Sequence, residues 1–225
     1  MNKLFVVSAP SGTGKTTLNN RLTSEFSNIE ISVSQTTRKP REGDVNGVSY
    51  HFVPVEVFQA MIDSGEMLEW ADVFGNFYGT SHKEIDRIMA KNHDVLLEID
   101  VQGCMSILRR KPQTITIFIL PPSIETLWHR LEQRGTDPLK VRWRRFLEAK
   151  HEIDAGHVYE HFIVNDNVDR AYGELKSIII DGKHSTHSHK EGLDICRKLM
   201  NEYQTSPLLQ DLKDKFGEDL GPVHG

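Results

Sequence analysis

The ten residues SAPSGTGKTT at 8–17 limit the possible folds more than any other part of the sequence. They follow the apolar run LFVVS at 4–8, which is typical of a buried strand in a parallel sheet, and they lead into a helical pattern. Their spacing matches G-x-x-x-x-G-K-[ST], except that Ala9 occupies the first glycine position. A strand, a glycine-rich loop and a helix in this order predict a phosphate-binding loop within an α/β fold.

The residues of this loop suit a nucleoside triphosphate bound together with Mg²⁺. Gly12 and Gly14 allow the backbone to turn its N–H groups inward, and the following helix directs its positive end at the phosphates. Lys15 supplies an ammonium for the β- and γ-phosphates, and the Thr16 hydroxyl offers an oxygen ligand to the metal. The alternative is a glycine-rich turn without a ligand, which the order of strand, loop, lysine, hydroxyl and helix disfavours. The predicted ATP contacts in the loop are Ala9, Pro10, Ser11, Gly12, Thr13, Gly14, Lys15, Thr16 and Thr17.

Further apolar runs alternate with helical patterns along the chain. Strands are predicted at 95–99, 115–120 and 162–164, and helices around 124–131 and 175–179, where apolar residues recur at helical spacing. Strands that alternate with helices imply βαβ units. We therefore predict a P-loop NTPase fold of the α/β class, with a parallel-sheet core and helices on both faces.

Residues 31–80 follow a different pattern, with short alternating segments, a turn signal DVNG at 44–47 and one helix-like piece. Such a pattern is typical of a small, mixed or mostly antiparallel subdomain inserted into the α/β core. We assign 34–80 to this subdomain, and 3–33 together with 81–181 to the core.

Two segments near the end of the chain stand apart from this core. An arginine-rich stretch at about 134–145 contains a glycine and a proline, and it is predicted to be a mobile loop that acts as a lid. Residues 182–225 are predicted to form a helical C-terminal extension. Its apolar stripes at 195–200 and 209–216 would dock on the core or on a second subunit, so a homodimer is one expectation.

Composition limits the partners and the compartment. The 225 residues include 27 basic and 32 acidic side chains, and the resulting net charge of −5 argues against a nucleic-acid partner. Two cysteines, Cys104 and Cys196, are too few for a disulfide framework and are typical of reduced thiols in a cytosol. The apolar run at 115–120 is too short to cross a bilayer, and no secretory signal is visible. We expect a cytoplasmic protein without a membrane partner.

A second polar cluster follows the phosphate loop in the sequence. The segment SQTTRKPREG places Arg38 and Arg41 three residues apart around a proline, and the planar fork of arginine suits a dianionic phosphate. Tyr50, Glu69 and the FYGT segment at 77–80 add hydroxyls and a carboxylate. These groups predict a pocket for a monophosphate that carries a polar base.

With these motifs the chain resembles the guanylate kinase family of ATP:GMP phosphotransferases, of the bacterial type. The resemblance covers roughly residues 3–181 and keeps the family's order and spacing. The matching segments are SAPSGTGKTT at 8–17, SVSQTTRKPREGDVNGVSYHFV at 32–53, GNFYGTS at 75–81, EIDVQG at 98–103, FILPPS at 118–123, LEQRGTD at 131–137 and FIVNDN at 162–167.

The resemblance implies a reaction and a set of ligands. It implies reversible transfer of the ATP γ-phosphoryl group to GMP or dGMP, giving ADP and GDP, in purine nucleotide metabolism. Mg²⁺ is the implied cofactor and ATP the implied co-substrate. The GMP-binding subdomain and the lid would close over both substrates and exclude water, because ATP would otherwise be hydrolysed.

The resemblance also assigns roles to single residues. The implied contacts to the GMP phosphate are Arg38, Arg41, Tyr50 and Tyr78. The implied contacts around the guanine are Ser34, Glu69, Gly79, Thr80 and Glu98, where Glu98 replaces the family's usual Asp and places its carboxylate one methylene further out. The implied ATP-side contacts beyond the loop are Arg130, Arg134 and Asn165. Asp100 lies near the metal and the acceptor, and it is implied to contact GMP together with Arg145. The implied catalytic set is Lys15, Arg38, Asp100, Arg134 and Arg145.

Two other functions are compatible with parts of the sequence. A kinase of a related small phosphate, such as a ribosyl bisphosphate, needs no guanine contacts, whereas Ser34, Glu69 and Thr80 form a complete set. Guanylate-kinase-like domains also serve as phosphopeptide-binding scaffolds. Those typically lose the phosphate loop, whereas Gly14 and the residues after it are intact here.

Some residues have an ordinary structural interpretation as well as a functional one. His184, His187 and His189 are compatible with a metal site, but a solvated connector is favoured because no carboxylate or cysteine nearby in the sequence completes a ligand set. Cys104 is expected to be a small buried side chain on the helix after Asp100.

Overall fold

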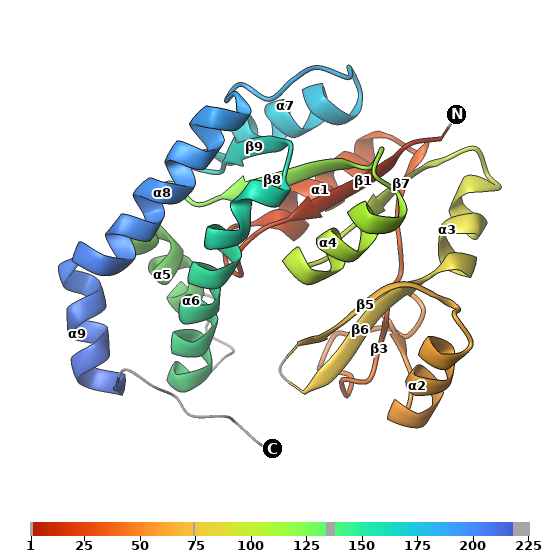
Figure 1. The fold of residues 1–225 in the computed structure, drawn as a ribbon, viewed down its shortest axis with the longest axis horizontal. Helices are drawn as coiled ribbons and strands as arrows, with labels where there is room; N and C mark the ends of the chain where they lie inside the picture. The colour runs from red at the N-terminus through yellow and green to blue at the C-terminus, as the bar shows by residue number, and fades with distance from the viewer. Residues whose placement is uncertain (1, 74, 134–137, 218–225) are drawn as a thin grey trace. The chain divides into compact units, whose positions relative to one another are not determined.

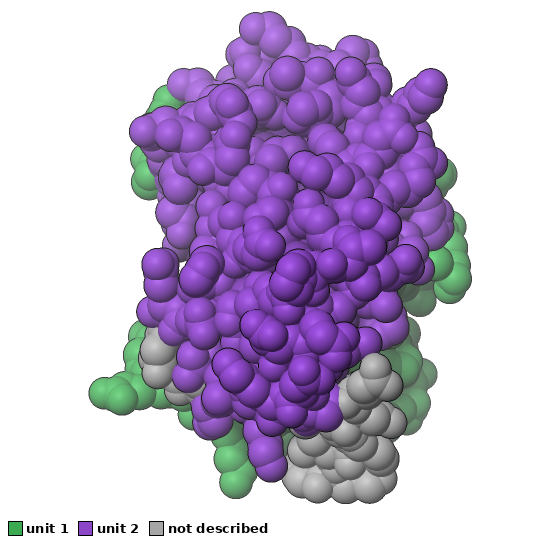
Figure 2. Space-filling view, turned by 90° about the vertical axis from the view of Figure 1, so that its left-hand side faces the viewer, with its two compact units in different colours: residues 1–6, 23–115, 223–225 green, residues 7–22, 116–222 purple. Residues whose placement is uncertain are grey.

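The computed structural model of the chain describes residues 2–73, 75–133 and 138–217. Two compact units are distinguished by colour in Figure 2. Unit 1 comprises residues 1–6, 23–115 and 223–225, and unit 2 comprises residues 7–22 and 116–222. Among the described residues, no helix combines the length and the apolar character needed to span a membrane.

Five strands form the first sheet, in the order β2-β7-β1-β8-β9 (Figure 1). β1 and β2 both pair parallel with β7, and β8 pairs parallel with β9, which confirms the predicted α/β fold with a parallel-sheet core. All five side chains of β1 are buried, as expected for a central parallel strand. The strand predicted at 95–99 ends earlier, at Leu97. The bounds are β1 Leu4–Ser8, β2 Ile29–Ile31, β7 Asp94–Leu97, β8 Ile115–Leu120 and β9 His161–Val164.

Four strands of unit 1 form a second, mixed sheet in the order β4-β3-β6-β5. β3 pairs parallel with β4 and antiparallel with β6, and β5 pairs antiparallel with β6. Phe58 of the neighbouring helix stacks on Phe77 of β6 with ring centroids 5.4 Å apart, which covers one side of this sheet with an aromatic pair. The bounds are β3 Gln35–Thr36, β4 His51–Phe52, α2 Val55–Asp63, β5 Met67–Val73 and β6 Asn76–Ser81.

Two helices of unit 1 begin at capping side chains. The Ser81 hydroxyl accepts from the N–H of Glu84 at the start of α3, and the Asp100 carboxylate accepts from the N–H of Gly103 at the start of α4. Cys104 is fully buried on α4, which confirms its predicted packing role. The bounds are α3 His82–Met89 and α4 Val101–Arg110.

The predicted lid differs from the structure over most of its described length. Pro138 precedes α6 and the helix begins at Leu139, so residues 139–145 form helical turns instead of a loop. Trp143, Phe146 and Ala149 recur at helical spacing and are fully buried, and this burial explains why the helix begins so early. Residues 134–137 lie outside the described residues.

The helices after β9 continue the packing of unit 2. The Tyr203 hydroxyl donates to the carbonyl of Phe146 at 2.7 Å, and the Glu202 carboxylate accepts from the backbone N–H of Ile124 at 3.0 Å. Leu199 and Leu212 are buried, so the apolar stripes of the C-terminal helices are used within this unit. The bounds are α1 Lys15–Glu25, α5 Ile124–Gln133, α6 Leu139–Asp154, the 3₁₀ helix η1 Ala155–Val158, α7 Val168–Ile179, α8 His189–Thr205 and α9 Pro207–Phe216.

Candidate nucleotide-binding sites

The glycine-rich loop of unit 2 joins β1 to α1, as the sequence predicts. Gly12 and Gly14 have φ values of 97° and 99°, in the region that favours glycine. A Cβ atom on Gly14 would also lie 2.7 Å from Nδ2 of Asn165, so both space and backbone conformation require a glycine there. Lys15 is the first residue of α1 and Thr16 follows it with an exposed side chain. The loop therefore ends on a helix N-terminus that carries an ammonium and a hydroxyl, which suits an anion.

Arg130 and Asn165 hold the backbone of this loop. The Thr13 carbonyl accepts from Asn165 Nδ2 at 2.7 Å and from Arg130 Nη1 at 3.3 Å, and Arg130 Nη2 donates to the carbonyl of Asn165 at 2.8 Å. Burial lowers the pKa of Arg130, while the charge of Asp166 acts in the opposite direction. Both residues were predicted as ATP contacts; the structure shows them bonded to the loop, and their contact with ATP stays a prediction.

Of the two other arginines that were predicted to contact the transferred phosphoryl group, the structure describes Arg145 but not Arg134. Arg134 lies outside the described residues. Arg145 is half-buried on α6, in the turn that also carries the buried Phe146. Because α6 is packed in unit 2 through residues such as Phe146, the backbone that carries the Arg145 guanidinium is held in place.

Four of the five predicted guanine contacts, Ser34, Glu69, Gly79 and Thr80, lie on or directly beside the second sheet, whereas Glu98 follows β7 of the first sheet. Glu69 lies inside β5, directly opposite Thr80 of β6, and Thr80 Oγ1 lies 3.1 Å from the Ser34 hydroxyl. β5 continues past Glu69 to Val73. Gly79 is required beside it: a Cβ there would lie 2.6 Å from the Glu69 carbonyl oxygen.

The Glu69 carboxyl group is buried and incompletely paired. Glu69 is 3% exposed, and this burial raises the pKa of its carboxyl group to about 7. A hydrogen bond from the Thr80 hydroxyl lowers the pKa, the charge of Asp100 raises it, and the Thr80 backbone bond lowers it again. Within the described residues, Glu69 Oε1 has no hydrogen-bond partner. A buried acceptor without a partner is rare in folded proteins, and it points to a ligand that donates hydrogen bonds.

The predicted phosphate contacts form a second cluster in unit 1. The Arg38 guanidinium lies 5.4 Å from the Tyr50 ring centroid, and the Tyr50 and Tyr78 rings meet edge to face at 5.7 Å. Burial raises the pKa of Tyr50, with Tyr78 adding to the shift and Arg38 opposing it. The structure thus gathers Arg38, Tyr50 and Tyr78, three of the four residues that were predicted to contact a phosphate. Glu98 also acts on the pKa of Tyr50, which places its charge near this cluster.

Asp44 also belongs to this cluster, although the sequence predicts for it only a place in the turn at 44–47. Its Oδ2 lies 2.9 Å from Arg38 Nη2 and accepts from the backbone N–H of Arg41 at 2.7 Å. The N–H bond from Arg41 is the main cause that lowers the pKa of Asp44, and Arg38 contributes further. A carboxylate therefore pairs with the Arg38 guanidinium and with the backbone of Arg41, where a phosphate group is expected. The signal in the sequence was its spacing of three residues after Arg41.

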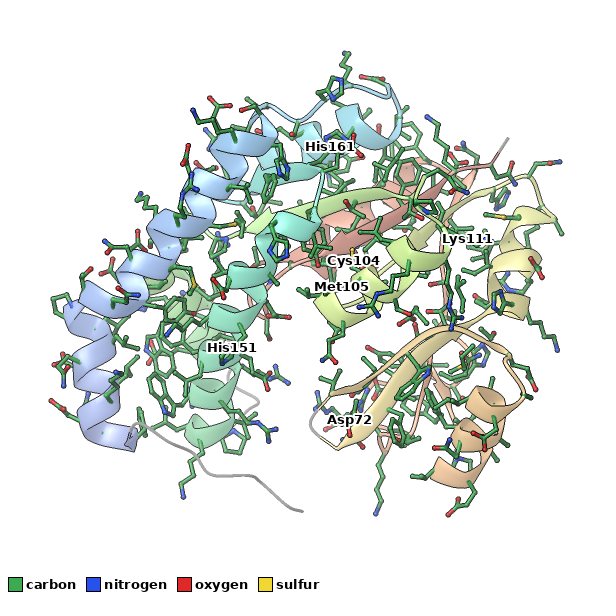
Figure 3. All side chains as sticks on the ribbon, viewed as in Figure 1. Asp72, Cys104, Met105, Lys111, His151 and His161 are labelled. Carbon is green, nitrogen blue, oxygen red and sulfur yellow. The ribbon has the colours of Figure 1, made fainter. Side chains whose placement is uncertain are left out.

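The histidine-rich connector of unit 2 also needs a correction. The Glu160 carboxylate completes a group with His161 and His184 whose ligand atoms lie within 4.8 Å of one another, so a carboxylate is in fact nearby (Figure 3 labels His161). However, the N–H of Ser185 donates to His161 Nδ1 at 3.3 Å, and burial lowers the pKa of His161. The neutral ring then carries its proton on Nε2, which lies 3.8 Å from Glu160. The bond from Ser185 thus occupies Nδ1 of the free ring, and the interpretation of this segment as a connector stays a prediction.

A glycine-rich loop after a strand of a parallel sheet, together with a buried and incompletely paired carboxyl group on a mixed sheet, is the arrangement expected of a nucleoside monophosphate kinase of the P-loop class. Comparisons with known proteins agree: a sequence model of the family described as "Guanylate kinase" matches residues 1–182. The chain belongs to the guanylate kinase family. It is 48% identical over 176 residues to a guanylate kinase of Neisseria gonorrhoeae, covering 78% of this chain and 86% of that protein. It is 45% identical over 195 residues to a guanylate kinase of Myxococcus xanthus, covering 86% and 91%.

The fold comparison gives the same family. A crystal structure of guanylate kinase from Anaplasma phagocytophilum matches with a TM-score of 0.64 and 30% identity, covering 97% of both chains. A match of this extent runs well past residue 182, into the C-terminal helices. The recognised family, the fold class and the enzyme class predicted from sequence are thereby confirmed.

Proposed function

We propose that this protein transfers the γ-phosphoryl group of ATP reversibly to GMP, giving ADP and GDP, and that dGMP is also accepted. The observation that carries the proposal is the buried Glu69 carboxyl group, which lies opposite Thr80 with its Oε1 unpartnered among the described residues. Guanine presents two adjacent donors, the N1–H and the exocyclic amine, whereas a carboxylate only accepts. The ionised carboxylate would meet the lone pair of adenine N1 with a lone pair of its own.

Ionisation of Glu69 couples to the base. Because its pKa is about 7 in the free protein, the carboxyl group is partly protonated near neutral pH. Two donors from guanine favour the charged form, since hydrogen bonds to a carboxylate lower its pKa. We therefore expect guanine binding to release part of a proton, and the Ser34 and Thr80 hydroxyls to complete the pocket.

The GMP phosphate is proposed to replace Asp44 between Arg38 and Arg41. A dianionic phosphate accepts from both guanidinium groups and from the Tyr50 and Tyr78 hydroxyls, and it carries more charge than the carboxylate it displaces. This contact fixes the attacking oxygen, and Asp100 is proposed to lie near it at the start of α4.

ATP is proposed to bind the glycine-rich loop through its phosphates. Lys15 neutralises the β- and γ-phosphates, and Arg134 and Arg145 neutralise the charge that develops on the transferred group. The donor set fits Mg²⁺, because the exposed Thr16 hydroxyl beside Lys15 is a hard oxygen ligand. When bound, the metal would supply charge neutralisation at the phosphate oxygens. Arg130 and Asn165 keep the loop in shape for this contact.

Closure and compartment complete the proposal. The 34–80 subdomain and the arginine-rich segment 134–145, whose residues from Leu139 onward belong to α6, are proposed to close on the substrates, which excludes water from the γ-phosphate. We propose that the protein acts in the cytoplasm on free nucleotides.

A coupled assay of ADP release tests the proposal directly. The initial rates with GMP, dGMP, AMP and UMP are compared at fixed ATP and Mg²⁺. We expect kcat/KM for GMP to exceed that for AMP by about 10³ or more, because a pocket built to satisfy donors rejects a ligand that leaves its buried acceptor unpaired. Similar values for AMP and GMP would contradict the assigned base pocket, and ADP release without any nucleoside monophosphate would indicate a hydrolase.

A further inference from the structure

Strand β5 contains a bulge immediately before Glu69. Met67 pairs with Ser81 and Glu69 pairs with Thr80, so Leu68 is the extra residue. In an ordinary strand successive side chains point to opposite faces, but these three consecutive residues of β5 are all buried. The bulge therefore sets the direction in which the Glu69 carboxyl group leaves the strand.

The side chain of Arg110 holds this bulge. Arg110 Nη1 donates to the Met67 carbonyl at 2.9 Å and to the Leu68 carbonyl at 2.8 Å. A single guanidinium nitrogen carries two hydrogens, so it can serve both carbonyls in one fixed geometry. Without this donor, the carbonyl of the extra residue would be left out of the strand ladder.

The helix that carries Arg110 also contacts the Glu69 side chain. Arg110 is the last residue of α4, whose course is marked in Figure 3 by Cys104 and Met105. At the first turn of the same helix, a Cβ on Gly103 would lie 2.7 Å from Glu69 Oε2. Seven residues of helix span about 10 Å, so α4 touches the carboxylate at one end and the backbone before it at the other.

We propose that Arg110 is a positioning residue for guanine selection: by holding the Met67 and Leu68 carbonyls, it fixes the Glu69 carboxylate where the guanine donors meet it. Arg110 acts through Glu69 and not on the substrate. The inference rests on the proposed function in taking Glu69 as the guanine contact, but the position of the carboxylate can be measured without substrate.

The first experiment compares three variants by steady-state kinetics. Arg110→Met keeps an unbranched stem and removes the donors, Arg110→Lys keeps a cation with donors, and Arg109→Met is the matched control at a neighbouring exposed position. We expect Arg110→Met to raise the KM for GMP about tenfold or more and to lower the GMP-to-AMP preference, since a misplacement of about 1 Å can cost about 100-fold. The kcat and the KM for ATP should stay near wild type. Arg110→Lys should be intermediate and Arg109→Met unchanged.

The second experiment titrates the Glu69 carboxyl carbon by NMR in the free protein. In the wild type the pKa is about 7, with Asp100 on α4 and Thr80 on β6 as the neighbouring groups. In Arg110→Met we expect it to move toward the ordinary value of 4.5, because a loosened bulge lets the carboxylate reach water. A purely structural role would lower the melting temperature and leave the pKa and the base preference unchanged.

The two experiments separate this inference from the proposed function. A wild type without guanine preference would refute the proposed function, while a shifted Glu69 pKa in Arg110→Met would still support the positioning role. A folded Arg110→Met with unchanged Glu69 pKa and unchanged GMP-to-AMP preference would overturn the inference. If Arg110→Met does not fold, Arg110→Lys decides in the same way.

Discussion

Gly103→Ala separates the stability of unit 1 from its ability to bind guanine. The added Cβ would lie 2.7 Å from Glu69 Oε2, and 3.2 and 3.3 Å from two carbon atoms of Ile99. The Ile99 contacts require shifts of a few tenths of an ångström, whereas the carboxylate oxygen has to retreat by about 0.7 Å to reach ordinary contact. The substitution therefore acts mainly on the group that is proposed to bind the base.

We expect Gly103→Ala to change the stability little and to lower the catalytic efficiency with GMP strongly. Alanine in place of glycine inside a helix contributes about 1 kcal/mol of stability, which offsets the crowding at Ile99. We therefore expect a melting temperature close to the wild type. A displacement of about 1 Å can cost about 100-fold in rate, so we expect kcat/KM for GMP to fall about 30-fold. The KM for ATP should not change, since Gly103 belongs to unit 1 and the phosphate loop to unit 2.

The assay is coupled ADP release with GMP and with AMP, alongside thermal unfolding of each protein. Gly173→Ala is the matched control, because Gly173 lies within α7 and its added Cβ would meet nothing within 4 Å. The control should keep wild-type kinetics. A stable Gly103→Ala protein with wild-type kcat/KM for GMP would refute the assignment of Glu69 to the base pocket.

Three further substitutions test other parts of the structure. Burial raises the pKa of Glu69 from 4.5 to about 7, so the folded protein binds this proton more tightly than the unfolded chain does. The wild type therefore loses stability as the pH rises from about 4.5 to about 7. Glu69→Gln should therefore flatten the unfolding free energy between about pH 4.5 and 7 in urea titrations; identical slopes would count against the raised pKa. Lys15→Ala should fold and bind GMP normally in calorimetry but lose about 10³-fold or more in turnover, and near-normal turnover would remove Lys15 from catalysis. In Gly192→Ala the Cβ would lie 2.1 Å from the Phe162 ring, so chemical denaturation should show a loss of about 2 kcal/mol or more. An unchanged midpoint would mean that Gly192 of α8 does not lie against Phe162 of β9.

Local chemistry explains which parts of the fold could be predicted from the sequence. The strand, loop and helix at 4–25 form a continuous stretch in which the turn depends on two glycines, and both adopt positive φ. The strands at 115–120 and 162–164 were found because buried parallel strands are continuously apolar. The prediction of a loop at 139–145 was wrong because the many arginines of this segment outweighed the helical spacing of apolar residues that begins at Trp143.

The candidate site depended on contacts that sequence periodicity does not reveal. Arg130 and Asn165 reach the Thr13 carbonyl from 117 and 152 residues away. The guanine contacts were assigned only through the family resemblance, and the bulge before Glu69 was not foreseen at all. A bulge is decided by its partners, here β6 and Arg110, and neither leaves a pattern in the strand's own residues.

The unpaired oxygen of Glu69 shows how stability and selection are balanced in unit 1. Arg110 donates to the carbonyls of Met67 and Leu68, whereas the glutamate at the next position is buried with Oε1 unpartnered among the described residues. Leaving a buried acceptor unpaired costs about 1–3 kcal/mol of folding stability. In the proposed complex, guanine would recover this free energy by donating to the oxygen, and adenine would not. The unpaired acceptor that weakens the free protein would then be the source of the proposed preference between the two bases.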